Sequence, residues 1–169
     1  MLKSALFSSP LGPILTISDD NGLYLLEFTE KQKLEKEIEH LESLLKTTIT
    51  SGATSAINSI NKELSEYFAG SLKQFKTPIH IIGTNFQKMV WQELLKTPYG
   101  EIRSYHEQAT AIGKPTSYRA VANGNGANKF AIIIPCHRII NKNGKLGGYS
   151  AGLSRKKWLI EHEARNQRH

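Results

Sequence analysis

The chain contains a single cysteine, Cys136, which lies between an apolar run and two basic side chains. The apolar run, residues 130–134, is rich in β-branched residues and predicts a short buried strand. Pro135 has no amide hydrogen and a fixed φ, so this strand is expected to end just before the thiol. His137 and Arg138 follow at once, and a neighbouring cation favours the thiolate over the thiol. The pattern indicates a nucleophilic cysteine, with a buried inert cysteine as the alternative.

A nucleophilic cysteine needs a base, and His137 is the adjacent candidate. Neighbouring side chains on an extended chain point to opposite faces, so a bridging water would relieve the geometry between the two groups. A carboxylate is expected to orient the imidazole, and Glu163 near the end of the chain is one candidate among several. These residues alone leave open a cysteine hydrolase with a Cys-His-Glu triad.

The charge of the 169-residue chain is concentrated in the half that contains the cysteine. Residues 1–85 carry 8 Lys+Arg against 10 Asp+Glu, whereas residues 86–169 carry 14 against 5. The second half therefore has a net charge of +9 within a total of +7. Basic surfaces of this kind bind phosphate backbones, because the release of counterions drives association. A merely solubilising surface is the alternative.

Several classes of protein are not expected. No apolar run approaches the roughly 20 residues that a membrane span needs, and the N-terminus has no signal-peptide pattern. A sole cysteine excludes an internal disulfide and any zinc site built on paired cysteines. No phosphate-binding loop or cofactor motif is present. We therefore expect a cytoplasmic protein with a free thiol and no cofactor or metal.

The first part of the chain, residues 1–83, has the pattern of a structural α/β domain. Short β-branched runs predict strands, and apolar residues at three- and four-residue spacing predict helices. The expected strands are residues 2–8, 13–18, 23–28 and 78–82, with 47–51 a strand or loop, and the expected helices are 30–46 and 54–69. No cluster of acids, histidines or glycines in this part forms a catalytic pattern.

The second part, residues 84–169, is mostly helical in its pattern. Thr84 and Gln87 form a capping box that predicts a helix over residues 85–96. Further helices are expected from Ser104 to Ile112, over residues 116–123 and over residues 154–165, with glycine-rich loops at 124–128 and 147–152. The two middle helices, separated by Gly113-Lys114-Pro115, have the outline of a helix-turn-helix. A plain helical hairpin is the alternative.

Several motifs in this part resemble the O6-alkylguanine-DNA alkyltransferases, the family of methylated-DNA–protein-cysteine methyltransferases. They are Ile134-Pro135-Cys136-His137-Arg138-Ile139, Gly148-Tyr149-Ser150, Trp158-Leu159 before Glu163, Val90-Trp91, Pro98-Tyr99-Gly100, Ser104-Tyr105, Lys114-Pro115 and Arg119-Ala120-Val121. The resemblance runs from about Thr84 to Glu163, and the first half matches in outline only. It implies an α+β fold, with a ribonuclease H-like α/β domain over 1–83. A mostly helical, winged helix-turn-helix-like domain for DNA binding and alkyl acceptance would follow over 84–169.

The resemblance also implies a function. A protein of this family would flip the damaged nucleotide out of double-stranded DNA and transfer its alkyl group irreversibly to Cys136. The substrate would be O6-alkylguanine, and O4-alkylthymine as well, with one reaction per molecule. The protein would act as a monomer, with cooperative binding along DNA left open. A non-catalytic binder of alkylated DNA is the alternative, although such relatives replace the cysteine.

The catalytic roles implied by the resemblance belong to four residues. Cys136 would be the acceptor thiol, and His137 would deprotonate it through a water. Glu163 would orient His137. Tyr105 would donate a proton to the departing guanine and help to rotate the nucleotide.

The remaining implied roles concern DNA and the substrate pocket. Arg119 would fill the gap left by the flipped base, with Ser117 and Ala120 beside it on the DNA-binding helix. Asn128 would tie that helix to the active-site strand. The pocket residues would be Asn128, Pro135, Ile139, Tyr149 and Ser150, with the Ser150 amide facing O6. Two positions depart from the usual pattern, because Lys129 stands where many relatives have proline and Ala151 where glycine is frequent.

Overall fold

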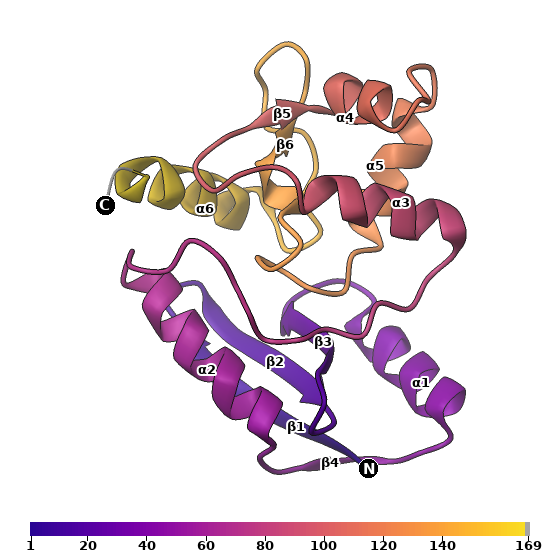
Figure 1. The fold of residues 1–169 in the computed structure, drawn as a ribbon, viewed down its shortest axis with the longest axis vertical. Helices are drawn as coiled ribbons and strands as arrows, with labels where there is room; N and C mark the ends of the chain where they lie inside the picture. Colours follow the sequence, from indigo (N-terminus) through magenta and orange to yellow (C-terminus); the bar gives the residue numbers. More distant parts are fainter. Residues whose placement is uncertain (168–169) are drawn as a thin grey trace. The chain divides into compact units, whose positions relative to one another are not determined.

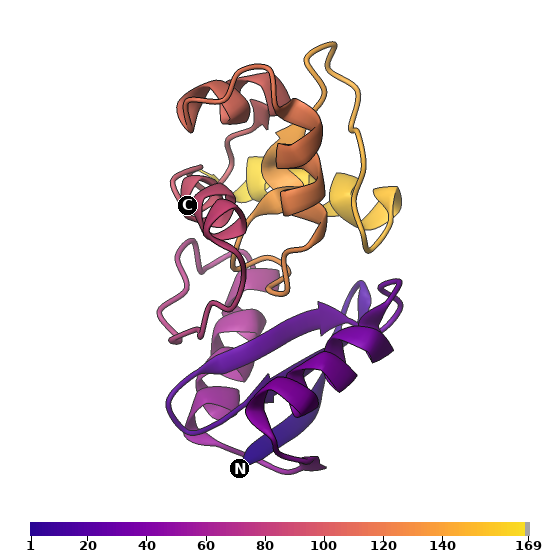
Figure 2. The same cartoon turned by 90° about the vertical axis from the view of Figure 1, so that its right-hand side faces the viewer.

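The computed structural model describes residues 1–167, which form two compact units (Figures 1 and 2). The first unit ends at Ile81 and the second begins at Ile82. Each unit has helices and strands, so the predicted α+β class is confirmed. Within the described residues, no helix is long and apolar enough to cross a membrane.

The first unit contains a four-stranded sheet with the order β3-β2-β1-β4. The strands are β1 (Leu2–Ser9), β2 (Gly12–Ser18), β3 (Leu23–Phe28) and β4 (Ile49–Ser51). The first three are antiparallel neighbours, whereas β4 pairs parallel to β1. The predicted strand over 78–82 is wrong, because this segment makes only a single bridge from Ile79 to Leu23.

Two helices complete this unit, α1 (Leu34–Leu45) and α2 (Ser55–Phe68). Helix α2 packs on β1 and β2 and buries one apolar face against the sheet. The residues of this core include Ile14, Ile17, Leu25, Leu26, Phe28, Ile57, Ile60, Leu64 and Tyr67. Helix α1 begins four residues later than predicted, after Lys33 takes a left-handed conformation at its start.

The second unit contains four α-helices and a two-stranded parallel ladder. The helices are α3 (Asn85–Leu94), α4 (Tyr105–Ala111), α5 (Tyr118–Gly126) and α6 (Leu153–Asn166), and the strands are β5 (Arg103–Ser104) and β6 (Ile139–Ile140). Helices α3, α4 and α5 pack on one another. The capping box at Thr84 is formed as predicted, and Ser104 forms a second one with Glu107.

Helix α5 extends through the segment 124–126, which was predicted to be part of a loop. Tertiary contacts stabilise this last turn, although glycine and asparagine are weak helix formers. Gly124 lies so close to α3 that an added Cβ would meet Val90 at 3.2 Å. Trp91 donates a hydrogen bond to the Gly124 carbonyl at 2.9 Å, and Asn125 exchanges two hydrogen bonds of 2.8 Å with Gln108. The glycine thus permits close packing of α3 and α5.

The predicted strand over residues 130–134 is also wrong, since this segment forms a turn. Its backbone groups bond to one another within the turn and to the Asn128 side chain. Asn128 accepts a hydrogen bond from the Phe130 amide at 2.9 Å and donates one to the Ile134 carbonyl at 2.8 Å. Four of the five apolar side chains are nevertheless buried, so the apolar run correctly predicted a buried segment. Cys136 consequently opens a 3₁₀ turn, η1 (Cys136–Arg138), and the strand β6 follows it.

Candidate active site

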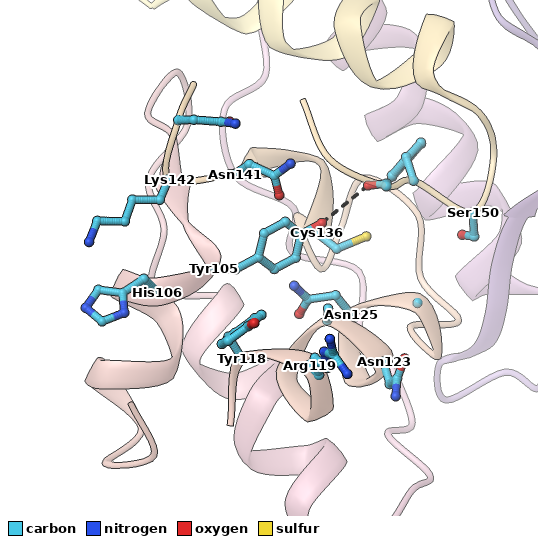
Figure 3. A pocket seen from close by; sticks show the side chains of 15 residues that line it. Tyr105, His106, Tyr118, Arg119, Asn123, Asn125, Cys136, Asn141, Lys142 and Ser150 are labelled. Carbon is cyan, nitrogen blue, oxygen red and sulfur yellow. Dashed lines mark hydrogen bonds between the residues drawn. The ribbon is translucent and has the colours of Figure 1, made fainter. Parts of the chain in front are cut away.

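Cys136 lies in a cavity of about 700 Å³ within the second unit (Figure 3). The wall comes from α4, α5, the turn after β6 and the loop before α6. The lining residues are Tyr105, His106, Tyr118, Arg119, Ala122, Asn123, Asn125, Gly126, Cys136, Asn141, Lys142, Asn143, Gly148, Tyr149 and Ser150. The cavity has the size of a small-molecule site, and its reactive group is the thiol.

The thiol is half-buried and held by its neighbours. The Cys136 amide donates to the Ile134 carbonyl at 2.8 Å, and the Asn128 amide nitrogen lies 3.4 Å from Sγ. Asn128 therefore supports both the turn before the cysteine and the sulfur itself. It lies behind the cavity wall, immediately after α5, and so links that helix to the active-site turn.

His137 and Glu163 form a fully buried pair behind the thiol. The Nε2 atom of His137 lies 2.7 Å from Oε2 of Glu163, and both side chains are at most 1% exposed. Burial lowers the pKa of His137, although the Glu163 charge opposes this shift. Because an ionised carboxylate can only accept hydrogen bonds, the proton of the neutral imidazole belongs on Nε2. The Nδ1 atom is buried, has no hydrogen-bond partner among the described residues and is left as the basic nitrogen.

Arg138 holds the carboxylate from the other side. Its Nε and Nη2 atoms donate to the two oxygens of Glu163 at 2.7 and 3.1 Å, and Nη1 donates to the Thr97 carbonyl at 2.7 Å. Burial of Glu163 opposes ionisation, but His137 and Arg138 hold the pKa of this carboxyl well below its usual range. The guanidinium thus binds Glu163, and its predicted role as a cation for the thiol is replaced by that of a support for the carboxylate.

Tyr105 lies at the start of α4 and lines the same cavity as the sulfur. Its hydroxyl donates a hydrogen bond of 3.4 Å to the Gly148 carbonyl, shown dashed in Figure 3. Burial, together with the negative charge of Cys136, raises the pKa of Tyr105 above its ordinary value. The phenol is therefore a protonated donor at neutral pH, facing the cavity that contains the thiol.

Five of the residues predicted for the site line the cavity directly: Tyr105, Arg119, Cys136, Tyr149 and Ser150. His137, Glu163 and Asn128 are buried behind it, as are Pro135 and Ile139. Ala120 is exposed on α5 outside the wall, and Ser117 occupies the N-cap position without a side-chain capping bond.

Sequence reasoning did not identify several wall and supporting residues. Tyr118, Arg119, Ala122, Asn123 and Gly126 form one face of α5, and the helical period would have grouped them around Arg119. Asn141, Lys142 and Asn143 belong to a turn whose position depends on the tertiary structure. Lys156, buried behind the wall, had no local signal that distinguished it from its neighbours Arg155 and Lys157.

Comparisons with known proteins cover nearly the whole chain. The family model described as "6-O-methylguanine DNA methyltransferase, DNA binding domain" matches residues 85–165. The model described as "6-O-methylguanine DNA methyltransferase, ribonuclease-like domain" matches residues 2–81. The chain belongs to this methyltransferase family. The resemblance seen in the motifs is confirmed, and it extends to the first half of the chain.

Individual relatives agree with this result. A methylated-DNA–protein-cysteine methyltransferase of Methanosarcina barkeri is 42% identical over 164 residues, which cover 96% of this chain and 98% of the relative. Its counterpart in Mycobacterium tuberculosis is also 42% identical, over 96% of this chain and 93% of the relative. The crystal structure of the M. tuberculosis O6-methylguanine methyltransferase matches with a TM-score of 0.83 and 40% identity, covering 98% of this chain and 94% of that one. A structure of the M. tuberculosis protein in complex with DNA has the same TM-score at 37% identity, covering 98% of this chain and 93% of that one.

Proposed function

We propose that this protein repairs DNA by transferring the alkyl group of O6-alkylguanine, and of O4-alkylthymine, irreversibly to Cys136. The observation that carries the proposal is the arrangement of the thiol at a cavity, with the buried His137–Glu163 pair behind it and Tyr105 in the cavity wall. The named activity of the relatives, methyl transfer from DNA to a protein cysteine, supports it. Residues 84–169 would bind DNA and accept the alkyl group, and residues 1–83 would be structural.

Access to the lesion requires base flipping. The O6 atom of guanine lies inside the base stack, so the nucleotide must rotate into the cavity at a cost of a few kcal/mol. Arg119 is exposed on α5 beside the cavity, next to the small residue Ala120. It would enter the stack and occupy the space of the flipped base. Phosphate contacts of the basic second half would supply affinity without sequence preference.

The transfer itself uses a proton acceptor that is buried behind the cavity wall and a proton donor that lines the cavity. Glu163 holds the proton of His137 on Nε2, so Nδ1 takes the proton of Cys136 through a water. The thiolate attacks the alkyl carbon, the carbon–sulfur bond forms, and the bond to O6 breaks with its electron pair left on guanine. Tyr105 then protonates the departing base. A thioether is stable to hydrolysis, so each molecule reacts once, as a monomer in the cytoplasm and without a cofactor.

Mass measurement of the modified protein tests this proposal. The protein is incubated with duplex DNA containing O6-methylguanine, and the tryptic peptide with Cys136 is weighed. We expect a mass gain of one methyl group, stoichiometric with DNA repaired and without turnover. A non-catalytic binder would leave the peptide unmodified after prolonged binding, and a hydrolase would turn over without a lasting adduct. Either result would contradict the transfer.

Arg119→Ala tests the base-flipping role. Repair of duplex DNA is expected to slow by roughly tenfold to a hundredfold, because the flipped state loses the side chain that fills its gap. The reaction with free O6-benzylguanine needs no flipping and should stay within about twofold. Single-turnover rates on both substrates measure the difference. Lys88→Ala, which removes an exposed cation on α3, is the matched control. Equal losses on both substrates would count against a stack-filling role.

A further inference from the structure

Lys156 is a buried cation that the proposed chemistry does not use. It lies in the first turns of α6 with its residue fully shielded from solvent, a rare position for lysine. Among the described residues no carboxylate pairs with its ammonium, which contacts two carbonyl groups and an aromatic ring. A buried charge is costly unless it is hydrogen-bonded, so these partners indicate what the ammonium does.

Its two hydrogen bonds go to the loop that precedes α6. The Nζ atom donates to the carbonyls of Leu146 and Gly148, the second at 3.0 Å. Gly148 lines the cavity with Cys136, so the lysine holds one part of the wall from behind. Two charge-assisted bonds to alternate carbonyls restrain the backbone of this short loop.

The same loop is joined to Tyr105. The Gly148 carbonyl accepts a bond from the Tyr105 hydroxyl as well as from Lys156, and the ammonium lies 5.7 Å from the centroid of the Tyr105 ring. Gly147, with φ 71°, packs so closely on this ring that an added Cβ would lie 2.9 Å from it. One carbonyl oxygen therefore connects the lysine of α6 to the phenol of α4.

We propose that Lys156 is a positioning residue for alkyl transfer, which holds the loop 146–148 so that the Gly148 carbonyl keeps the Tyr105 oxygen in place at the cavity until the hydroxyl rotates to give its proton to the departing base. This inference rests on the proposed function, because Tyr105 is the proton donor of that reaction. A hydroxyl displaced by about 1 Å loses much of its value as a donor, since rates depend steeply on the geometry of the reacting groups. The backbone of this loop thus positions the proton donor, and Lys156 keeps the loop in place.

The charge of the ammonium is sensitive to its surroundings. Burial lowers the pKa of Lys156 to about 8, while the negative charge of Cys136 opposes this shift. The other groups that face it are the Tyr105 ring and His137, and its positive charge contributes to the lowered pKa of the imidazole. The ammonium is therefore charged at neutral pH and loses its proton, and with it the strength of both loop bonds, above about pH 8.

Lys156→Met, which keeps the length of the side chain and removes its donors, is the direct test. Its single-turnover rate on O6-methylguanine duplex near neutral pH should fall by roughly tenfold to a hundredfold. Wild-type protein should lose rate as the pH rises above about 8, and the variant should lack this decline. Lys156→Arg, which can donate to the same carbonyls, should recover part of the rate. Lys157→Met removes an exposed lysine one residue later and should leave rate and pH profile unchanged. A Lys156→Met rate within about twofold of wild type, with the wild-type pH profile, would overturn the proposal.

Hydrogen exchange of the wild-type protein tests the restraint of the loop 146–148 by Lys156, here called the clamp, without DNA and without a variant. The amides of residues 146–150 should lose protection between neutral pH and about pH 9, beyond the intrinsic acceleration of exchange, while those of α3 stay protected. Constant protection of the loop across this range would exclude the clamp. Because this measurement needs no alkyl transfer, it separates failure of the clamp from failure of the proposed function. The latter would appear as wild-type protein that leaves Cys136 unmodified.

Discussion

Cys136→Ser is expected to abolish alkyl transfer while DNA binding stays within about twofold of wild type. A serine hydroxyl is almost never ionised at neutral pH, so the weak base His137 cannot produce a competent nucleophile from it. The side chain is similar in size and contributes to the cavity wall without packing in the core. Transfer of labelled methyl groups from DNA to protein, together with a binding titration on duplex DNA, gives the two quantities.

The control for this variant is wild-type protein whose thiol has been blocked with iodoacetamide, which also prevents transfer. Loss of binding in Cys136→Ser as large as the loss of transfer would indicate a structural cysteine. Loss of the contact between the sulfur and Asn128 does not explain such an effect, because Asn128 keeps its bonds to Phe130 and Ile134. Preserved binding without transfer would make the variant equivalent to a non-catalytic binder of alkylated DNA.

Glu163→Gln should have the second largest effect, on stability as well as on rate. The carboxylate accepts hydrogen bonds from His137 and from two nitrogens of Arg138, and a glutamine offers them one oxygen and an amide group that donates. Removing one partner of a buried ion pair leaves an uncompensated charge, which costs about 3–5 kcal/mol in free energy of unfolding. The transfer rate should fall by roughly 10²-fold or more, because the imidazole loses the group that keeps its proton on Nε2.

The pH dependence of unfolding distinguishes this loss from general damage. The folded-state pKa of Glu163 lies below its ordinary value of 4.5, so the carboxylate adds stability above that pH, and the contribution is lost as the pH falls through the folded pKa. The variant should lack this part of the acid dependence in denaturant titrations. Glu161→Gln, at an exposed position of α6 with a 4.0 Å contact to Lys157, is the control and should change stability by less than about 1 kcal/mol. Equal stability of Glu163→Gln and wild type would refute the account of the buried cluster.

The periodic patterns of the chain predicted most elements, and the two largest errors have the same cause. Residues 130–134 form a turn because Asn128 satisfies their backbone groups, and residues 124–126 are helical because they pack on α3 and α4. In both segments a side chain outside the segment supplied the deciding hydrogen bonds. Asn128 lies just before the turn, whereas Trp91 and Gln108 come from α3 and α4. A run of β-branched residues indicates that a segment is buried, and glycines indicate that its backbone is conformationally free. Neither pattern shows which other group will form hydrogen bonds with the segment.

The sequence by itself determined the chemistry-bearing motif, the family and the concentration of positive charge in the second half, because these depend on residue identity and short spacings. The tertiary structure decided which atoms meet. It directs Arg138 to Glu163, leaves Nδ1 of His137 as the basic nitrogen, and places Lys156 of α6 behind Tyr105 of α4. These pairings join residues up to 51 positions apart in the chain. They follow from how the helices and turns pack, which no local pattern encodes.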